Sequence, residues 1–346
     1  MPPDPTELQI AAVAPVILGW HFFGYDERHE TDATGGVAAR GAAVILGVGG
    51  CTLRAFLVCA LLAAATASAQ DLEPRAYSYV PPGMDFLVVG YGYAKGSVST
   101  DPALPIEDAK LAQSTSVLAW ARSFGLWGRV AKVDVIVPCS SLSGSARVAG
   151  EEIERHISGL GDPRLRLTWI FHGAPVPSSA ERRPGDLVVG ASVQVTGPAG
   201  QYDDSRVVNL GSNRWAVKPE LGMSKAWGPV SLELASAVTF FQDNRDFLGQ
   251  TREQDPLYAF QAHLVYSFRR ALWVALDGTY YLGGRTRVGD IRNDDLQRNT
   301  RAGVTFAMPL SARQSLKLNA STGVSTRFGG DWDAAGLAWQ VRWAGP

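Results

Sequence analysis

RQSLKLNASTGVSTRF, residues 313–328, is the stretch that decides the fold. Apolar or small side chains occupy every second position, and most positions between them are polar. Successive side chains of a β-strand point to opposite faces, so this period of two predicts a strand with one dry and one polar face. The dry face comprises Leu316, Leu318, Ala320, Thr322, Val324 and Thr326, and the other face carries Lys317, Asn319, Ser321, Ser325 and Arg327.

The same period returns repeatedly from residue 84 onward. In 257–270, for example, Tyr258, Phe260 and Leu264 alternate with Gln261 and His263. We expect roughly twelve strands of about ten residues or more, the length that crosses a bilayer when tilted. The expected spans are 84–97, 114–125, 129–142, 160–171, 186–197, 213–226, 230–242, 257–269, 271–283, 299–309, 314–327 and 334–343.

The connections between these spans alternate in length. Long ones cover 99–113, 143–159, 198–212, 243–256 and 284–298, and short ones cover 124–129, 227–229, 268–271 and 309–314. The fourth connection, 172–185, is long and rich in proline and departs from the rule. Short turns on one side and long loops on the other are typical of outer-membrane barrels, and an even strand number places both termini at the periplasmic side.

A soluble β-sandwich is the alternative, because its strands also alternate between a dry and a wet face. Sandwich strands usually have about five or six residues, fewer than the spans expected here. The sequence therefore predicts an all-β fold, an antiparallel up-and-down transmembrane β-barrel of about twelve strands over residues 70–346.

The last expected strand is rich in aromatic residues. Leu337, Trp339, Val341 and Trp343 alternate with small or polar residues. Such a strand resembles the signal that the barrel-assembly machinery recognises, although the tail 344–346 continues past the final aromatic residue. Further Trp and Tyr residues near strand ends suit the aromatic girdles of the membrane interfaces.

The barrel region is preceded by LRAFLVCALLAAATASAQDLEP, residues 53–74. A cation, a short apolar run and Ala67-Ser68-Ala69 are typical of a secretory signal peptide. The run is too short to span a bilayer, and a buried core helix remains the other reading. We predict a signal peptide at 53–69 cleaved near Ala69/Gln70, and a non-native extension at 1–52 that reflects a start codon assigned too far upstream.

Charge and cysteine content exclude some classes of protein. The chain has 32 Lys and Arg against 33 Asp and Glu, so no basic surplus indicates a nucleic-acid partner. After the expected cleavage site only Cys139 remains, which allows no intramolecular disulfide.

Several blocks resemble the family named for the MetA pathway of phenol degradation, a group of outer-membrane transporters. The resemblance covers nearly all of residues 72–343 and implies location and architecture, together with a link to aromatic catabolism. It supplies no site residues. The blocks are SGLGDPRLRL (158–167), GASVQVTGPAGQYD (190–203), NRWAVKPELGMSKAWG (213–228), TREQDPLY (251–258), DGTYYLGGR (277–285) and KLNASTGVSTRF (317–328).

Alternation also predicts which charged side chains face the lumen. Cations outnumber anions among them, which favours a mildly anion-selective pore. The alternative is a salt-bridged, hydrated filling, because the lumen of a barrel of about twelve strands is narrow. The expected residues are Lys132, Asp134, Arg164, Arg166, Arg214, Lys218, Glu220, Glu233, His263, Asp277, Arg301, Lys317, Arg327 and Arg342.

Other chemistry has weaker support. A barrel lipase needs Ser and His within hydrogen-bond reach, and no His–Ser pair at a suitable spacing is evident among His156, His172 and His263. We therefore expect no enzyme, no catalytic residues and no cofactor. The acidic clusters Asp203-Asp204, Asp243/Asp246 and Asp294-Asp295 match no EF-hand spacing and are expected to be solvated loops rather than metal sites.

The sequence thus predicts an exported outer-membrane barrel that passes small solutes passively. Its expected partners are outer-membrane lipid and lipopolysaccharide, the barrel-assembly machinery and a small-molecule solute. The alternative is a structural or adhesive surface protein whose lumen is plugged.

Overall fold

The computed structural model describes residues 73–99, 106–148, 151–175, 187–206, 208–269 and 272–344. All regular elements in these ranges are strands, and no helix long and apolar enough to cross a membrane occurs among them. The strands are β1 (Met84–Ser99), β2 (Ile106–Leu126), β3 (Arg129–Val148), β4 (Glu151–Leu160), β5 (Arg164–Pro175), β6 (Val188–Thr196), β7 (Ala216–Trp227), β8 (Val230–Phe241), β9 (Asn244–Phe247), β10 (Gln250–Gln254), β11 (Leu257–Arg269), β12 (Leu272–Gly283), β13 (Thr286–Val288), β14 (Ile291–Arg292), β15 (Gln297–Pro309), β16 (Gln314–Ser325) and β17 (Gly329–Ala344).

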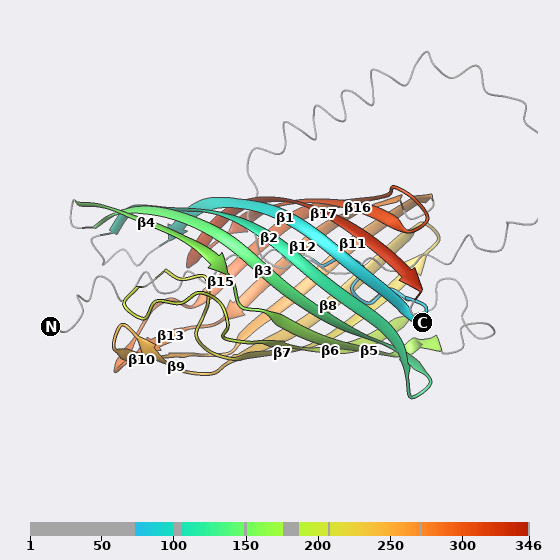
Figure 1. Cartoon of the computed structure of the whole chain (residues 1–346), viewed down its shortest axis with the longest axis horizontal. Helices are drawn as coiled ribbons and strands as arrows, with labels where there is room; N and C mark the ends of the chain where they lie inside the picture. The colour runs from blue at the N-terminus through green and yellow to red at the C-terminus, as the bar shows by residue number, and fades with distance from the viewer. Residues whose placement is uncertain are drawn as a thin grey trace, which may run out of the picture.

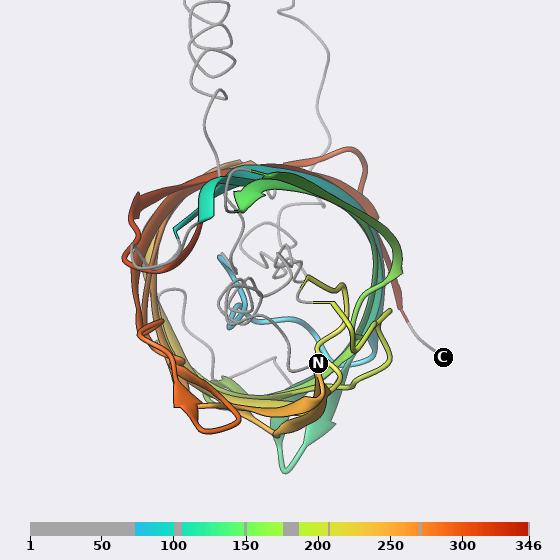
Figure 2. The same ribbon diagram turned by 90° about the vertical axis from the view of Figure 1, so that its left-hand side faces the viewer.

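The long strands close into one antiparallel barrel (Figures 1 and 2). Its ring order is β1, β2, β3, β5, β6, β7, β8, β11, β12, β15, β16 and β17, and β17 returns to pair with β1. This confirms the predicted twelve-stranded barrel. β4 pairs with the outer part of β3, above β5, so β4 and β5 form one strand interrupted at 161–163.

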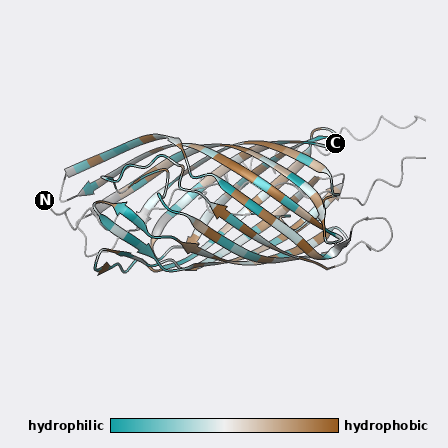
Figure 3. Ribbon diagram, turned by 60° about the horizontal axis from the view of Figure 1, so that its bottom comes forward, coloured by the Kyte–Doolittle hydropathy of each residue, from teal (hydrophilic) through white to brown (hydrophobic). Residues whose placement is uncertain are grey.

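The two faces of the wall differ as the period of two predicts. On β16, Leu318 is 44% and Val324 is 62% exposed, whereas Lys317 next to Leu318 is 2% exposed. Hydrophobic and hydrophilic positions alternate along the barrel strands, while the end that carries the small sheet is mainly hydrophilic (Figure 3). The apolar side chains therefore form the outer, lipid-facing wall.

The inner wall is apolar on one side and charged on the other. Buried residues of β1, β2, β3 and β17, such as Phe86, Val117, Ile136 and Trp332, form a continuous hydrophobic cluster inside the ring. The charged inward residues lie mainly on β3 and on β5 to β16. The lumen is therefore amphipathic, and the apolar side was not among the lumen features predicted from the alternation.

The ends of the barrel differ in their connections. Tight turns join β2 to β3 and β7 to β8, and Trp127 and Gly128 both have positive φ angles, of 50° and 70°, in the first of them. This conformation suits a two-residue hairpin. Met84 pairs with Ala344 at this same end, so both ends of the barrel sequence lie there. We call it the periplasmic end, following the rule that periplasmic turns are short.

The opposite, external end holds structure that the sequence analysis assigned to loops. β9, β10, β13 and β14 form a separate four-stranded sheet within the connections expected at 243–256 and 284–298. β2 starts at Ile106 instead of 114, and β4 occupies part of the expected 143–159 loop. These strands extend above the lipid. No apolar outer face is required there, so the alternation of apolar and polar residues is weaker. Residues 1–72 and 176–186 lie outside the described residues.

Candidate functional site

Residues Glu73–Val80, the luminal segment, lie inside the barrel (Figure 2). Glu73, Tyr77, Tyr79 and Val80 are each at most 3% exposed. The segment joins β1 at the periplasmic end through Pro81–Gly83, and Gly83 has a φ of 83°, which glycine adopts without strain. The periplasmic half of the lumen is thus occupied by the protein's own chain.

Arg166 on β5 is the centre of the contacts that hold this segment. Its Nη1 donates to Glu73 Oε2 at 2.6 Å and its Nη2 donates to Glu220 Oε1 at 2.7 Å. All three side chains are at most 3% exposed. Lys218 Nζ lies 3.5 Å from Glu220 Oε2, so two cations and two anions balance in this group. Charges buried in this way are tolerated only when paired and hydrogen-bonded.

Tyr77 fits against two wall glycines that lack side chains where its ring lies. Gly190 on β6 and Gly222 on β7 are register partners. A Cβ on Gly222 would lie 2.0 Å from Tyr77 Cε2, and one on Gly190 would lie 2.8 Å from Cδ1. The Tyr77 hydroxyl donates to Glu220 Oε1 at 2.8 Å. A strand glycine often marks such a close approach, and here it accommodates an aromatic ring.

The backbone of the luminal segment is also held by charged groups of the wall. Lys132 Nζ donates to the carbonyl of Ala76 at 2.6 Å. The amide of Arg75 donates to Glu233 Oε2 on β8. Since the segment contacts β3, β5, β7 and β8, its position is fixed by residues from much of the ring.

A second buried network continues around the wall. His263 Nδ1 lies 2.7 Å from Asp277 Oδ1, and Thr305 Oγ1 donates to Asp277 Oδ2 at 2.7 Å. Lys317 is 2% exposed. His263 is therefore one partner of a buried pair with Asp277.

The external mouth is narrowed by the connection between β6 and β7, whose described residues 197–206 and 208–215 fold inward across one side of the ring (Figure 2). Asp162 fixes this connection, because its Oδ1 accepts from the Gly200 amide at 2.9 Å and its Oδ2 accepts from the Ser212 amide at 2.8 Å. Asn244 Nδ2 donates to the Tyr202 hydroxyl at 2.8 Å and so links the connection to the small sheet. Arg214 ends this connection and is 6% exposed.

The structure brings most of the predicted lumen residues into two bonded groups. The luminal-segment contacts bring together Lys132, Arg166, Glu220 and Glu233, with Lys218 and Asp134 near them. His263 and Asp277 form the second network, and Arg164, Arg301 and Lys317 are also buried. Whether any of them lines a conducting path stays a prediction.

Two predicted lumen residues lie at the rims instead. Arg327 lies two residues after the end of β16, and its Nη2 donates to Asp294 in the external loops at 2.9 Å. Arg342 donates to the Ala312 carbonyl in the periplasmic turn at 2.9 Å. The alternation predicts which face of the strand these two side chains occupy. It does not predict how far along the barrel axis they lie.

The acidic clusters are only partly solvated loops. Asp294 is exposed and pairs with Arg285 at 3.1 Å, whereas Asp295 is buried and accepts from the Thr286 amide at 2.8 Å. Asp203 accepts from the Ser205 hydroxyl at 2.6 Å, which lowers the pKa of the exposed Asp203 carboxyl. Within the described ranges, no three His, Cys, Asp or Glu side chains gather as metal ligands would.

One outward His does lie beside an outward Ser. His156 on β4 and Ser143 on β3 are register partners on the outer face at the external end. The structure gives no hydrogen bond between them within its described residues, and His156 Nε2 instead lies 3.8 Å from Glu154 Oε2. Both side chains of this ion pair are more than half exposed, which is typical of a surface pair.

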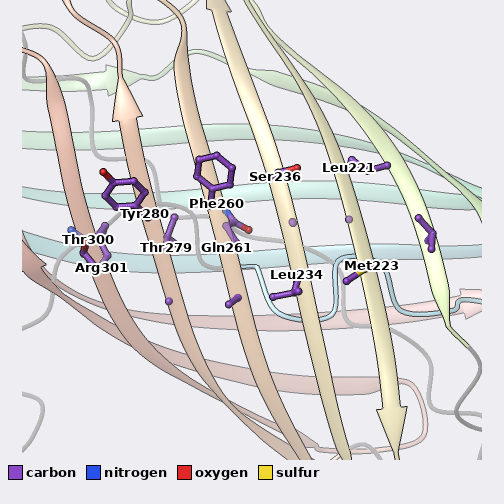
Figure 4. Close-up of a pocket in the computed structure, with 15 residues that line it drawn as sticks. Leu221, Met223, Leu234, Ser236, Phe260, Gln261, Thr279, Tyr280, Thr300 and Arg301 are labelled. Atoms are coloured by element: carbon purple, nitrogen blue, oxygen red, sulfur yellow. The ribbon is translucent and has the colours of Figure 1, made fainter.

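A groove of about 610 Å³ lies on β7, β8, β11 and β12 (Figure 4). Its walls include Leu221, Phe260 and Tyr280, which are outward-facing and exposed. Ala262 and Gly278 between them leave space. The groove therefore belongs to the lipid-facing wall and is not part of the lumen.

Sequence reasoning missed several residues of the site. Glu73 and Tyr77 lie in a segment without strand periodicity, so no pattern placed them in the lumen. Gly190 and Gly222 did carry a signal, since a glycine at an inward strand position indicates close backbone or ring approach.

Comparison with known proteins agrees with this architecture. The family model described as "Putative MetA-pathway of phenol degradation" matches residues 96–331. The COG4313 outer membrane channel from Pseudomonas putida F1 is 22% identical, with a TM-score of 0.69 over 79% of this chain and 100% of that one. At this identity the likeness establishes the fold alone. No functionally curated protein matches the chain.

Two further barrels are more distant. The beta domain of the Bordetella autotransporter BrkA is 8% identical, with a TM-score of 0.47 over 75% of this chain and 100% of that one. The NanC porin is 11% identical, with a TM-score of 0.43 over 74% of this chain and 98% of that one. Neither likeness carries an argument about this chain.

Proposed function

Because the chain belongs to this phenol-degradation family, we propose that it is an outer-membrane channel for the passive passage of small solutes, with aromatic compounds as the solute class. The observation that carries the proposal is the closed barrel with a lipid-facing apolar wall and an amphipathic lumen. A lumen that is apolar on one side and charged on the other suits solutes with a ring and a polar group.

We further propose that the channel favours anions. The predicted lumen residues other than Arg327 and Arg342, which lie at the rims, include seven Lys or Arg against four Asp or Glu. Purified protein in a planar bilayer should give discrete conductance steps, and the reversal potential in a salt gradient should show anion preference. A clear cation preference would contradict this selectivity.

The luminal segment supports a second candidate, a structural or adhesive surface protein with a plugged lumen. Glu73–Val80 occupies the periplasmic half of the barrel and makes buried ion pairs there. Wild-type protein and a variant that lacks residues 73–80 separate the two candidates. Conductance in the wild type supports the channel, and conductance only in the variant supports the plugged protein.

The solute class is tested in cells. A strain without the protein should take up radiolabelled phenol or benzoate more slowly than its parent at low external concentration, and a plasmid copy should restore the rate. Unchanged uptake of both compounds would count against an aromatic solute.

The remaining expectations are proposals of the same kind. We propose export through the signal peptide at 53–69, recognition of β17 by the barrel-assembly machinery, and contact with lipopolysaccharide at the external end. Trp343 is 38% exposed at the end of β17, so Trp343→Ala should lower the amount of protein in the outer membrane. We propose no catalytic role, and a lipid hydrolase activity lost in Ser143→Ala would contradict that.

A further inference from the structure

Arg214 is a buried cation at the external mouth. It lies on the inward side, two residues before β7, and is 6% exposed. Its guanidinium carbon lies 4.6 Å from the centre of the Phe241 ring, and its Nη2 donates to Gln254 Oε1 on β10. These contacts orient the guanidinium but supply no negative charge.

Arg252 approaches from the small external sheet. It lies on β10, where its register partners are Asn244 on β9 and Val288 on β13. Its guanidinium carbon lies 5.4 Å from the centre of the Phe247 ring. Arg252 and Arg214, which we call the arginine pair, thus come from two elements that close the same mouth.

The two guanidinium groups repel each other. Burial, and then the positive charge of Arg252, lowers the pKa of Arg214. Burial also lowers the pKa of Arg252. Among the charged neighbours of Arg214, Arg252 has the largest effect on this pKa, and the carboxylates of Asp243 and Asp162 oppose it.

Two of the nearby carboxylates are already engaged by neutral donors. Asp162 accepts from Gly200 and Ser212, and Asp295 accepts from the amide and hydroxyl of Thr286. In the described part of the chain, neither arginine of the pair forms a salt bridge. Arg214 Nη1 and Arg252 Nε are buried and have no hydrogen-bond partner among those same residues. Buried donors of this kind normally have partners, and each one left without a partner is costly.

We propose that the arginine pair binds the carboxylate of a small organic acid at the entrance of the barrel. A guanidinium presents N–H donors in a planar fork that matches the two oxygens of a carboxylate. The proposal rests on the proposed channel function and extends it, since it names the solute class that the mouth selects. The bound carboxylate neutralises the repulsion within the pair and gives the unpartnered donors an acceptor.

Isothermal titration calorimetry of the full-length protein in detergent tests this, with benzoate as probe and phenol as the uncharged ligand of similar ring. Benzoate should bind and phenol should not. Arg214→Gln and Arg252→Gln should each weaken benzoate binding about tenfold or more, the effect of losing one charge-assisted hydrogen bond. Arg292→Gln is the matched control, because Arg292 lies in the same sheet but is exposed and pairs with Asp255 at 2.9 Å. Its affinity should equal that of the wild type.

The two variants should fold, because each removes one of two like charges, and heat-modifiable migration in gels checks this. Equal binding of benzoate by wild type and both variants would overturn the proposal. Competition by inorganic phosphate as strong as that by benzoate would overturn the carboxylate assignment. Binding does not require conduction, so benzoate affinity without conductance refutes only the channel, and conductance without affinity refutes only this site.

Discussion

At the scale of residues, a single guanidinium connects the luminal segment to the wall. Arg166 pairs with Glu73 in the segment and with Glu220 in the barrel, and all three side chains are buried. The net benefit of such a group over apolar residues is small, but the loss of its central cation leaves two buried carboxylates unpaired. The buried ion pairs therefore fix the position of the luminal segment more than they increase the stability of the fold.

Arg166→Leu should destabilise the barrel by about 3–5 kcal/mol, the range for removing one partner of a buried ion pair. Urea unfolding of protein refolded into lipid vesicles, followed by tryptophan fluorescence, measures the change. Arg287→Leu is the comparison, because Arg287 and its partner Glu253 are both about half exposed. An Arg166 variant no less stable than the Arg287 variant would show that the buried group contributes little.

Gly222→Ala should push the luminal segment from its place, because a Cβ there would lie 2.0 Å from the Tyr77 ring. We expect a larger single-channel conductance than in the wild type, recorded in planar bilayers. Gly278→Ala is the control, since the nearest atoms to a Cβ at this strand glycine are 4.0 Å away.

A double variant isolates the contact. Tyr77→Ala removes the ring, so adding Gly222→Ala to Tyr77→Ala should change conductance no further. A further increase would mean that Gly222 acts through something other than Tyr77.

At the scale of elements, the membrane itself explains which strands could be predicted. A strand in lipid must present apolar residues at every second position, and this rule located β7, β8, β11, β12 and β16 to within three residues at either end. β4, β9, β10, β13 and β14 lie outside the lipid, where side chains on both faces can be polar. Short strands without alternation resemble loops in sequence.

The depth of a lipid-facing residue in the bilayer should determine how much free energy of unfolding is lost when a charged residue replaces it. Leu276 and Val324 are both 62% exposed, but Leu276 lies within β12 whereas Val324 lies next to the external end of β16. Leu276→Arg should destabilise by about 2–4 kcal/mol and Val324→Arg by about 0–1 kcal/mol. Unfolding in vesicles compares them, and equal costs would mean that these strands sit at a different height in the bilayer.

Within the candidate site, only the residues that lie on barrel strands could be predicted from the sequence. Period two gives the inward face, and it selected Arg166, Glu220 and His263. It could not select Glu73, whose partner Arg166 is 93 residues away and whose own segment has no periodicity. The pairing of Arg214 with Arg252 likewise depends on a sheet that forms above the barrel.

At the scale of the whole molecule, closure places both ends of the barrel sequence at one rim, where Met84 pairs with Ala344. Glu73 lies in the lumen, and in the sequence it comes shortly after the expected cleavage site. A chain cut before Gln70 therefore carries only three residues ahead of Glu73. Edman sequencing of protein from sucrose-gradient outer-membrane fractions should therefore begin at or near Gln70. An amino terminus at Met1 would contradict both the signal peptide and the assignment of 1–52 as an extension.

The luminal segment is joined to the wall by only three residues. It therefore competes, within the same molecule, with any solute that binds in the lumen. Its effective concentration in the pore is of the order of millimolar for so short a tether and does not depend on how much protein the cell makes. A solute that crosses must displace a ligand that never diffuses away. Solute flux would then saturate at a concentration set by the solute's affinity for the lumen. Molecules that do not bind the lumen would be excluded even when they are small enough to fit.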